Sequence, residues 1–246
     1  QEVEQQEAVT CLQGDLLVAA LSECVKAFRR HSTTWSCGWE LRRIPGSIVN
    51  DVSIDTSGSF VASAWEDGTI AVDAVSGTST SSWKSLMPTP VLSVAIYPSY
   101  EEALGQRVLC SGGQDGRLVL SRRGALEAKH ATLHLGEGPI SCVRWRGPLV
   151  AWATQKGVKI VDVETQQKVG FIPCSEPGSA HLCWLNDEAL LIGWDQEVLL
   201  VEVRQMSDGV AVRFAKVLRK IPVPGELVKQ LSQLVAWIAG LLVFKV

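Results

Sequence analysis

The residues best suited to chemistry in this chain are four histidines, seven cysteines and several aspartates in repeated positions. His130 and His134 are four residues apart, a spacing that on a helix places two imidazoles on one face, as in zinc sites. The segment 128–135 instead has the pattern of a strand, where both side chains point to one side and no third ligand is nearby. His31 lies in a polar segment and His181 begins an apolar strand, which favours a solvated and a hydrogen-bonded histidine. The sequence therefore predicts neither a metal site nor a cofactor.

Motifs for nucleophilic catalysis and phosphate binding are absent from the sequence, which contains no G-x-S-x-G elbow, P-loop or dinucleotide fingerprint. The glycine-rich run 112–116 lies between two strand-like runs, whereas a phosphate loop joins a strand to a helix. The recurring aspartates suit turns, because their side chains bond nearby backbone. We interpret them as turn residues and the chain as non-enzymatic; they are Asp55, Asp67, Asp115 and Asp195.

Composition excludes several classes of protein. The 246 residues are 46% hydrophobic and 20% charged, with a net charge of −3, which provides a full apolar core and too few charges for a disordered chain. The pairs Arg29-Arg30 and Arg42-Arg43 are too small to form a nucleic-acid footprint, so no nucleic-acid partner is expected. Seven cysteines without a C-x-x-C pair are typical of a reducing, cytoplasmic compartment.

The two ends of the chain carry distinct signals. Residues 1–8 are polar and acidic, unlike a signal peptide, and are expected to be flexible. Near the other end, residues 234–244 form an uncharged apolar run, but a membrane-spanning helix needs about 20 such residues. Because Gly240 interrupts this run, we expect two buried strands joined by a turn.

A repeat of two apolar runs flanking a small or polar turn occurs six times along the chain. The turns are centred near Ser22-Glu23, Asp67-Gly68, Asp115-Gly116, Lys156-Gly157, Asp195-Gln196 and Gly240, at intervals of 39 to 48 residues. Asp-Gly between apolar runs is a strong hairpin signal. Further strands are expected before each hairpin, beginning near Val52, Val91, Ile140 and Ala180. Outer strands are expected after it, over Thr78–Trp83, Lys129–Leu135 and Gln167–Ile172.

This period predicts an all-β fold, a WD40-like β-propeller over residues 9–246 with about six recognisable blade units. A ring of seven blades would need about 300 residues at this period, so we expect the last unit to be truncated and the propeller to be incomplete.

Nine tryptophans divide into two groups by their place in the repeat. One group recurs at equivalent positions and is predicted to be largely buried between strands: Trp65, Trp145, Trp152, Trp184 and Trp194. Trp35, Trp39 and Trp83 lie outside that register and are weak candidates for exposed partner-binding anchors, with simple loop packing as the alternative.

The stretch Gly136–Val203 resembles a known family. Its motifs are GEG at Gly136–Gly138, RWRG at Arg144–Gly147, AWA at Ala151–Ala153 and GVKIVD at Gly157–Asp162. Together with Ile54–Gly58 and Ser63–Gly68, they are similar to the N-terminal propeller of the vacuolar protein sorting-associated protein 41 family, over roughly residues 9 to 240.

This resemblance implies a subunit of the HOPS tethering complex, which fuses late endosomes, autophagosomes and vesicles with the lysosome or vacuole. The implied partners are other HOPS subunits, a Rab-family or Arf-like small GTPase and an adaptor complex on vesicles. The implied location is cytoplasmic and peripheral on endolysosomal membranes. A generic WD40-like adaptor of a ubiquitin-ligase or chromatin complex is the alternative within the fold. A propeller hydrolase is a third hypothesis, disfavoured because no convergent set of acids or metal ligands is visible.

Overall fold

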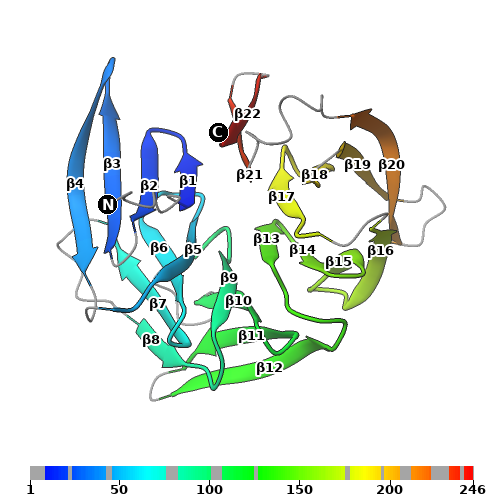
Figure 1. Cartoon of the computed structure of the whole chain (residues 1–246), viewed down its shortest axis with the longest axis horizontal. Helices are drawn as coiled ribbons and strands as arrows, with labels where there is room; N and C mark the ends of the chain where they lie inside the picture. Colours follow the sequence, from blue (N-terminus) through cyan, green and yellow to red (C-terminus); the bar gives the residue numbers. More distant parts are fainter. Residues whose placement is uncertain are drawn as a thin grey trace, which may run out of the picture. The chain divides into compact units, whose positions relative to one another are not determined.

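The computed structural model describes residues 9–21, 24–42, 46–75, 83–100, 107–124, 127–174, 178–194, 197–205, 212–222, 233–238 and 241–245. Over these residues the secondary structure is entirely β: five four-stranded antiparallel sheets and one two-stranded sheet (Figure 1). The chain divides into two compact units, residues 1–113 with 119–133 and residues 114–118 with 134–246. The predicted N-terminal segment 1–8 lies outside the described residues.

Strands of the first unit form two complete sheets. The first has the order β1-β2-β3-β4, from β1 (Val9–Gln13), β2 (Leu16–Leu21), β3 (Cys24–His31) and β4 (Thr34–Arg42). The second has the order β5-β6-β7-β8, from β5 (Val49–Ile54), β6 (Phe60–Trp65), β7 (Thr69–Ala74) and β8 (Trp83–Leu86). Sequence order and spatial order coincide in both sheets, because each strand pairs with the strand that follows it in the chain.

A third sheet has the order β12-β11-β10-β9. Its strands are β9 (Val91–Ile96), β10 (Val108–Gly113), β11 (Arg117–Arg123) and β12 (Ala128–Leu135). In the first unit, apolar side chains of β9 pack against β6 and β7 in one cluster that contains Phe60, Ile70, Val94 and Ile96. The edge-to-face pair of Phe60 and Tyr100, with ring centroids 5.2 Å apart, closes one side of this cluster.

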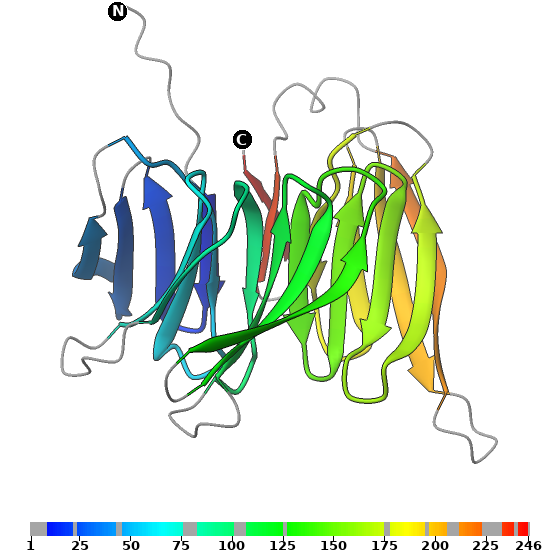
Figure 2. The same ribbon diagram turned by 90° about the horizontal axis from the view of Figure 1, so that it is seen from below.

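The second unit contains two four-stranded sheets and a strand pair. The sheet β13-β14-β15-β16 consists of β13 (Cys142–Arg146), β14 (Leu149–Thr154), β15 (Gly157–Asp162) and β16 (Gln167–Pro173). The sheet β17-β18-β19-β20 consists of β17 (His181–Trp184), β18 (Ala189–Gly193), β19 (Glu197–Gln205) and β20 (Arg213–Pro222). The strands β21 (Gln233–Ile238) and β22 (Leu241–Lys245) pair with each other. Figure 2 shows β13 to β20 running alongside one another.

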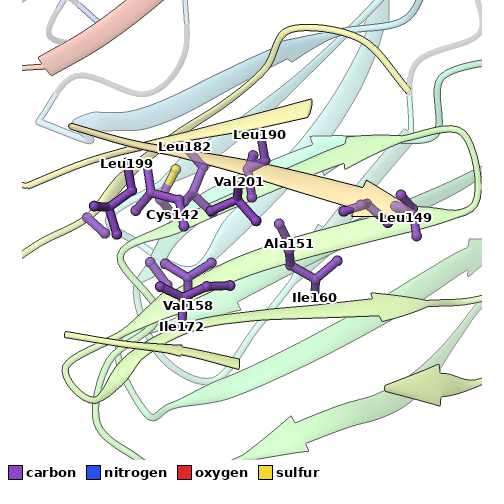
Figure 3. Packing of buried hydrophobic residues seen from close by; sticks show 14 of the residues in the cluster. Cys142, Leu149, Ala151, Val158, Ile160, Ile172, Leu182, Leu190, Leu199 and Val201 are labelled. Carbon is purple, nitrogen blue, oxygen red and sulfur yellow. The ribbon is translucent and has the colours of Figure 1, made fainter. Parts of the chain in front are cut away.

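The core of the second unit lies between its two large sheets (Figure 3). Ala151 and Ile160 from β14 and β15 share a cluster with Leu190 and Val201 from β18 and β19, and all four side chains are fully buried. Two of the second strands have no exposed face, because every residue of β6 and of β14 is buried. Their near-continuous apolar sequences suit this position, since such strands pack on both faces.

The structure confirms the all-β prediction and the positions of the hairpins. Turns occur at Asp67-Gly68, Asp115-Gly116 and Lys156 as predicted. Strands also pair on either side of Ser22-Glu23, Asp195-Gln196 and Gly240, although these turn residues themselves lie outside the described residues. The outer strands expected over Lys129–Leu135 and Gln167–Ile172 are β12 and β16. The one expected over Thr78–Trp83 begins at Trp83 among the described residues.

Candidate functional site

The three tryptophans considered as partner anchors lie in different environments. Trp35, on β4, is 44% exposed, and the guanidinium of Arg30 lies 5.9 Å from its ring centroid. Trp39, on the same strand, is half-buried and packs against the core cluster of the first two sheets. Trp83 is 7% exposed and belongs to the cluster between β6, β7 and β9. Only Trp35 of the three therefore presents a large apolar surface to solvent.

The tryptophans predicted to be buried are buried to different degrees. Trp65 and Trp152 are 0% and 3% exposed, as predicted. Trp145, Trp184 and Trp194 are half-buried, less than Trp65 and Trp152, and Trp184 and Trp194 pack against the core cluster of the second unit. Two of the three keep the indole N–H on a backbone carbonyl: Trp145 donates to Gly147 at 2.9 Å and Trp184 donates to Arg144 at 3.3 Å. An indole that packs its apolar ring against the protein and hydrogen-bonds its N–H suits a partly exposed position.

The histidines pair with neighbouring protein groups. His130 lies 2.8 Å from the hydroxyl of Ser121 and 3.3 Å from that of Ser85. His134 Nε2 lies 3.2 Å from the carbonyl oxygen of Gly136. Among the described residues no group of three histidines, cysteines or acids is placed to hold a metal ion. The two histidines thus support local packing at separate points of β12.

Aspartates at the turns act on the backbone as predicted. Asp67 accepts a hydrogen bond from the backbone N–H of Thr69 at 2.8 Å, and Asp115 accepts one from that of Arg117 at 3.1 Å. Asp55 accepts from the backbone N–H groups of Ser59 and Phe60. Asp195 lies outside the described residues. These contacts explain the recurrence of aspartate by turn geometry.

Two buried aspartates were missed by the sequence analysis because their partners are distant in sequence. Asp51, 4% exposed on β5, accepts hydrogen bonds from the hydroxyl of Ser93 and the backbone N–H of Val94 on β9. Asp162, 5% exposed, accepts from Arg213 on β20 at 2.7 Å while it also caps the turn after β15. Each carboxylate therefore links one sheet to its neighbour within a unit.

Residues of three sequence motifs meet in the second unit at the loop Gly136–Gly138, which follows β12: Glu137, Trp152 and Lys159. All three residues of this loop have positive φ, at 100°, 66° and 83°, and the middle one is Glu137. The loop lies close to the hairpin turn at Gly116, since a Cβ on Gly116 would lie 2.7 Å from the carbonyl oxygen of Gly138. A left-handed backbone at a non-glycine residue is costly, so other contacts must hold Glu137 in place.

Lys159 forms an ion pair with Glu137. Its ammonium nitrogen lies 2.7 Å from a carboxylate oxygen of Glu137, and the two side chains are 18% and 25% exposed. Register places Trp152, Lys159 and Phe171 side by side on one face of the sheet β13–β16. Lys159 therefore lies in a row between two aromatic rings. Its ammonium is also 5.9 Å from the centroid of Phe171, within cation–π range.

Charge and burial shift the pKa values of two groups in this cluster, which we call the GEG junction (His134, Glu137, Trp152, Lys159 and Phe171). The hydrogen bond from Lys159 lowers the pKa of Glu137 below its ordinary value. Burial, followed by the charge of Lys159, lowers the pKa of His134, whose ring lies 5.5 Å from that of Trp152. The junction therefore favours a neutral His134 beside an ionised Glu137.

Comparison with known proteins identifies the fold and the family. The β-propeller domain of Myceliophteria_thermophila Cps50 (Swd1) superposes with a TM-score of 0.72 at 12% identity, covering 88% of this chain and 72% of that one, and shows the fold alone. Within the described residues, no helix has the length and hydrophobicity needed to cross a membrane.

Sequence relatives share one name across plants, animals and fungi. The chain is 32% identical over 190 residues to the vacuolar protein sorting-associated protein 41 homolog of Arabidopsis thaliana, which covers 75% of this chain and 18% of the relative. The homologs of Solanum lycopersicum and Homo sapiens are 34% and 30% identical, over 64% and 71% of this chain and 17% and 20% of theirs. The chain thus spans about a fifth of the length of these relatives.

Residues 40–245 match the family model Beta-prop_Vps41, described as a Vps42 beta-propeller. This range includes the GEG junction and every strand from β5 onward. Because the match extends over most of the chain, the chain belongs to the vacuolar protein sorting-associated protein 41 family and corresponds to its β-propeller.

Proposed function

We propose that the chain is a non-enzymatic protein-interaction module of a HOPS-type tethering complex. In this role it acts in vesicle-mediated transport and in the fusion of late endosomes and autophagosomes with the lysosome or vacuole. The observation that carries the proposal is the family match over residues 40–245, together with relatives whose shared name refers to vacuolar protein sorting. The partners proposed are other HOPS subunits, a Rab-family or Arf-like small GTPase and an adaptor complex on vesicles.

Physical features of the described residues support a role in binding rather than in catalysis. The buried carboxylates of Asp51 and Asp162 are engaged in structural contacts. Asp51 accepts hydrogen bonds from Ser93 and Val94 of the neighbouring sheet, and Asp162 accepts one from Arg213. Rigid sheets with variable loops and exposed outer strands offer broad surfaces for partners. A cytoplasmic location, peripheral on endolysosomal membranes, follows from such partners.

Affinity capture tests the proposal. The protein, tagged and expressed at its natural level, is captured from cells and the bound proteins are identified by mass spectrometry. Enrichment of the other subunits of a vacuolar tethering complex, together with a small GTPase, is the expected result. A matched control is Asp51→Ala, which should destabilise the first unit and reduce the capture of the partners. Enrichment of ubiquitin-ligase or chromatin subunits by the parent chain would contradict the proposal in favour of a general adaptor.

A further inference from the structure

Strand β20 is the most positively charged strand of the second unit. Its ten residues, Arg213–Pro222, contain Arg213, Lys216, Arg219 and Lys220 and no acidic residue. It is the last strand in the order β17-β18-β19-β20, so one of its edges has no paired strand, and it lies at the periphery of its unit in Figure 1. A long edge strand with unpaired N–H and C=O groups can accept a further strand.

Large apolar side chains on β20 are exposed between these charges. Phe214, Leu218 and Ile221 are 38%, 48% and 38% exposed. Ala215 and Val217 instead pack against the core between the two large sheets. Register places Phe214 and Ile221 opposite Arg204 and Val198, on the face of the sheet opposite the one that Ala215 and Val217 share. The strand therefore presents an apolar and a basic surface together, which a solvated strand does not need.

Two cations of β20 are uncompensated. Arg213 pairs with Asp162 at 2.7 Å, and Lys220 lies 3.7 Å from Glu197. Lys216 lies opposite Glu202, but the carboxylate of Glu202 is paired with Arg204 at 2.5 Å. Within the described ranges, neither Lys216 nor Arg219 has an ion-pair partner. These positive charges are available to an acidic ligand.

We propose that the exposed edge of β20 binds an extended, acidic segment of a partner protein by strand addition. Main-chain hydrogen bonds to the edge would supply affinity. Acidic side chains next to Lys216 and Arg219, with aliphatic ones over Leu218 and Ile221, would supply specificity. This inference rests on the proposed function as an interaction module and names one surface for it.

Binding of a defined peptide tests the inference. The probe is a fluorescent ten-residue peptide, matched in length to β20, in which every second residue is in turn glutamate or valine and the residues between them are threonine. Because alternate side chains of a strand share a face, this peptide presents glutamate and valine together on one face. Fluorescence anisotropy should show saturable binding to the chain, and hydrogen–deuterium exchange should show new protection over residues 213–222. The same peptide methylated on every backbone nitrogen keeps its side chains and charge but cannot pair, and should not bind. Equal binding of the methylated peptide would overturn strand addition.

Charge variants locate the surface. The double variant Lys216→Glu/Arg219→Glu should weaken binding by about tenfold or more, because attraction becomes repulsion. The control Lys84→Glu/Lys129→Glu makes the same charge change on the outermost strands β8 and β12 and should leave binding unchanged. A probe with lysine in place of glutamate should bind the first double variant and not the parent chain, a rescue that also shows that this variant is folded. Equal weakening by both double variants would overturn the inference.

Two further outcomes separate this inference from others. The first is a parent chain that fails to bind the peptide but binds vesicles with anionic headgroups. If Lys216→Glu/Arg219→Glu also loses vesicle binding, strand addition is overturned in favour of a membrane surface. Failure of the peptide with continued capture of tethering subunits would overturn only the role of β20. Loss of that capture from the parent chain would overturn the proposed function whatever the peptide does.

Discussion

The carboxylate of Glu137 and the ammonium of Lys159 are 2.7 Å apart, and Glu137 is a non-glycine residue in the left-handed region of backbone conformation. Glu137 lies in the loop before β13, whereas Lys159 lies in the middle of β15. The pair therefore fixes the entry of the chain into the sheet β13–β16.

Substitution of Glu137 separates the ion pair from the backbone strain. Glu137→Ala and Glu137→Gly both remove the carboxylate, but only glycine adopts a φ of 66° without penalty. We expect Glu137→Ala to be less stable than Glu137→Gly by about 1 kcal/mol in free energy of unfolding. Urea denaturation followed by tryptophan fluorescence measures the difference. Equal stability of the two variants would show that the loop relaxes to a different conformation.

The lowered pKa of His134 predicts that the stability of the fold depends on pH. Its pKa is lowered in the fold by burial and by Lys159, so the unfolded chain binds more protons than the folded chain as pH falls through the ordinary histidine value of 6.5. Neutral His134 therefore stabilises the fold fully above about pH 6.5, and this stabilisation is lost as the pH falls from there through the lowered pKa. His134→Gln should reduce the drop in melting temperature between about pH 7.5 and about pH 5.5. His31→Gln, on an exposed histidine, is the control and should keep the parent's drop.

Gly68 is predicted to tolerate no larger residue, because a positive φ and a close backbone neighbour coincide there. Its φ is 88°, and a Cβ there would lie close to the backbone carbonyl of Met87 and 3.1 Å from that of Thr89. Gly68→Ala should therefore destabilise by about 3 kcal/mol or more. Gly14, with a φ of 56° and nothing within 4 Å of such a Cβ, is the matched control. Gly14→Ala should cost about 1 kcal/mol; thermal denaturation that ranks the two variants equally would disprove the steric explanation.

Asp51 is predicted to contribute more to stability than the turn aspartates. Asp51→Ala leaves the buried hydroxyl of Ser93 and the backbone N–H of Val94 without this acceptor, and each such group costs about 1–3 kcal/mol. Asp67→Ala removes one exposed hydrogen bond to Thr69 and should cost about 1 kcal/mol or less. Chemical denaturation of the two variants gives the comparison. An Asp51→Ala variant as stable as Asp67→Ala would contradict the assignment of Asp51 as a link between sheets.

Local signals in the sequence were sufficient for the fold and insufficient for the contacts between sheets. Asp67-Gly68 and Asp115-Gly116 predicted hairpins because turn chemistry depends on adjacent residues. Asp51 and Ser93 are 42 residues apart, and the pair Glu137 and Lys159 depends on register, so neither contact could be predicted from spacing. Trp83 is packed, as the alternative for it held, but the strands that cover it, β6, β7 and β9, could not be named from its sequence position.

A domain exchange tests the central claim that this chain is a working propeller of the vacuolar protein sorting-associated protein 41 family. In Schizosaccharomyces pombe, the propeller of the endogenous relative, which is 29% identical to the chain over 165 residues, is replaced by the chain within the full-length protein. Vacuolar sorting of a fluorescent cargo is then scored in living cells. We predict that sorting is restored to cells lacking the endogenous protein, and that the Asp51→Ala version restores less of it. A chimera that accumulates at the normal level, is folded and restores no sorting would contradict the claim.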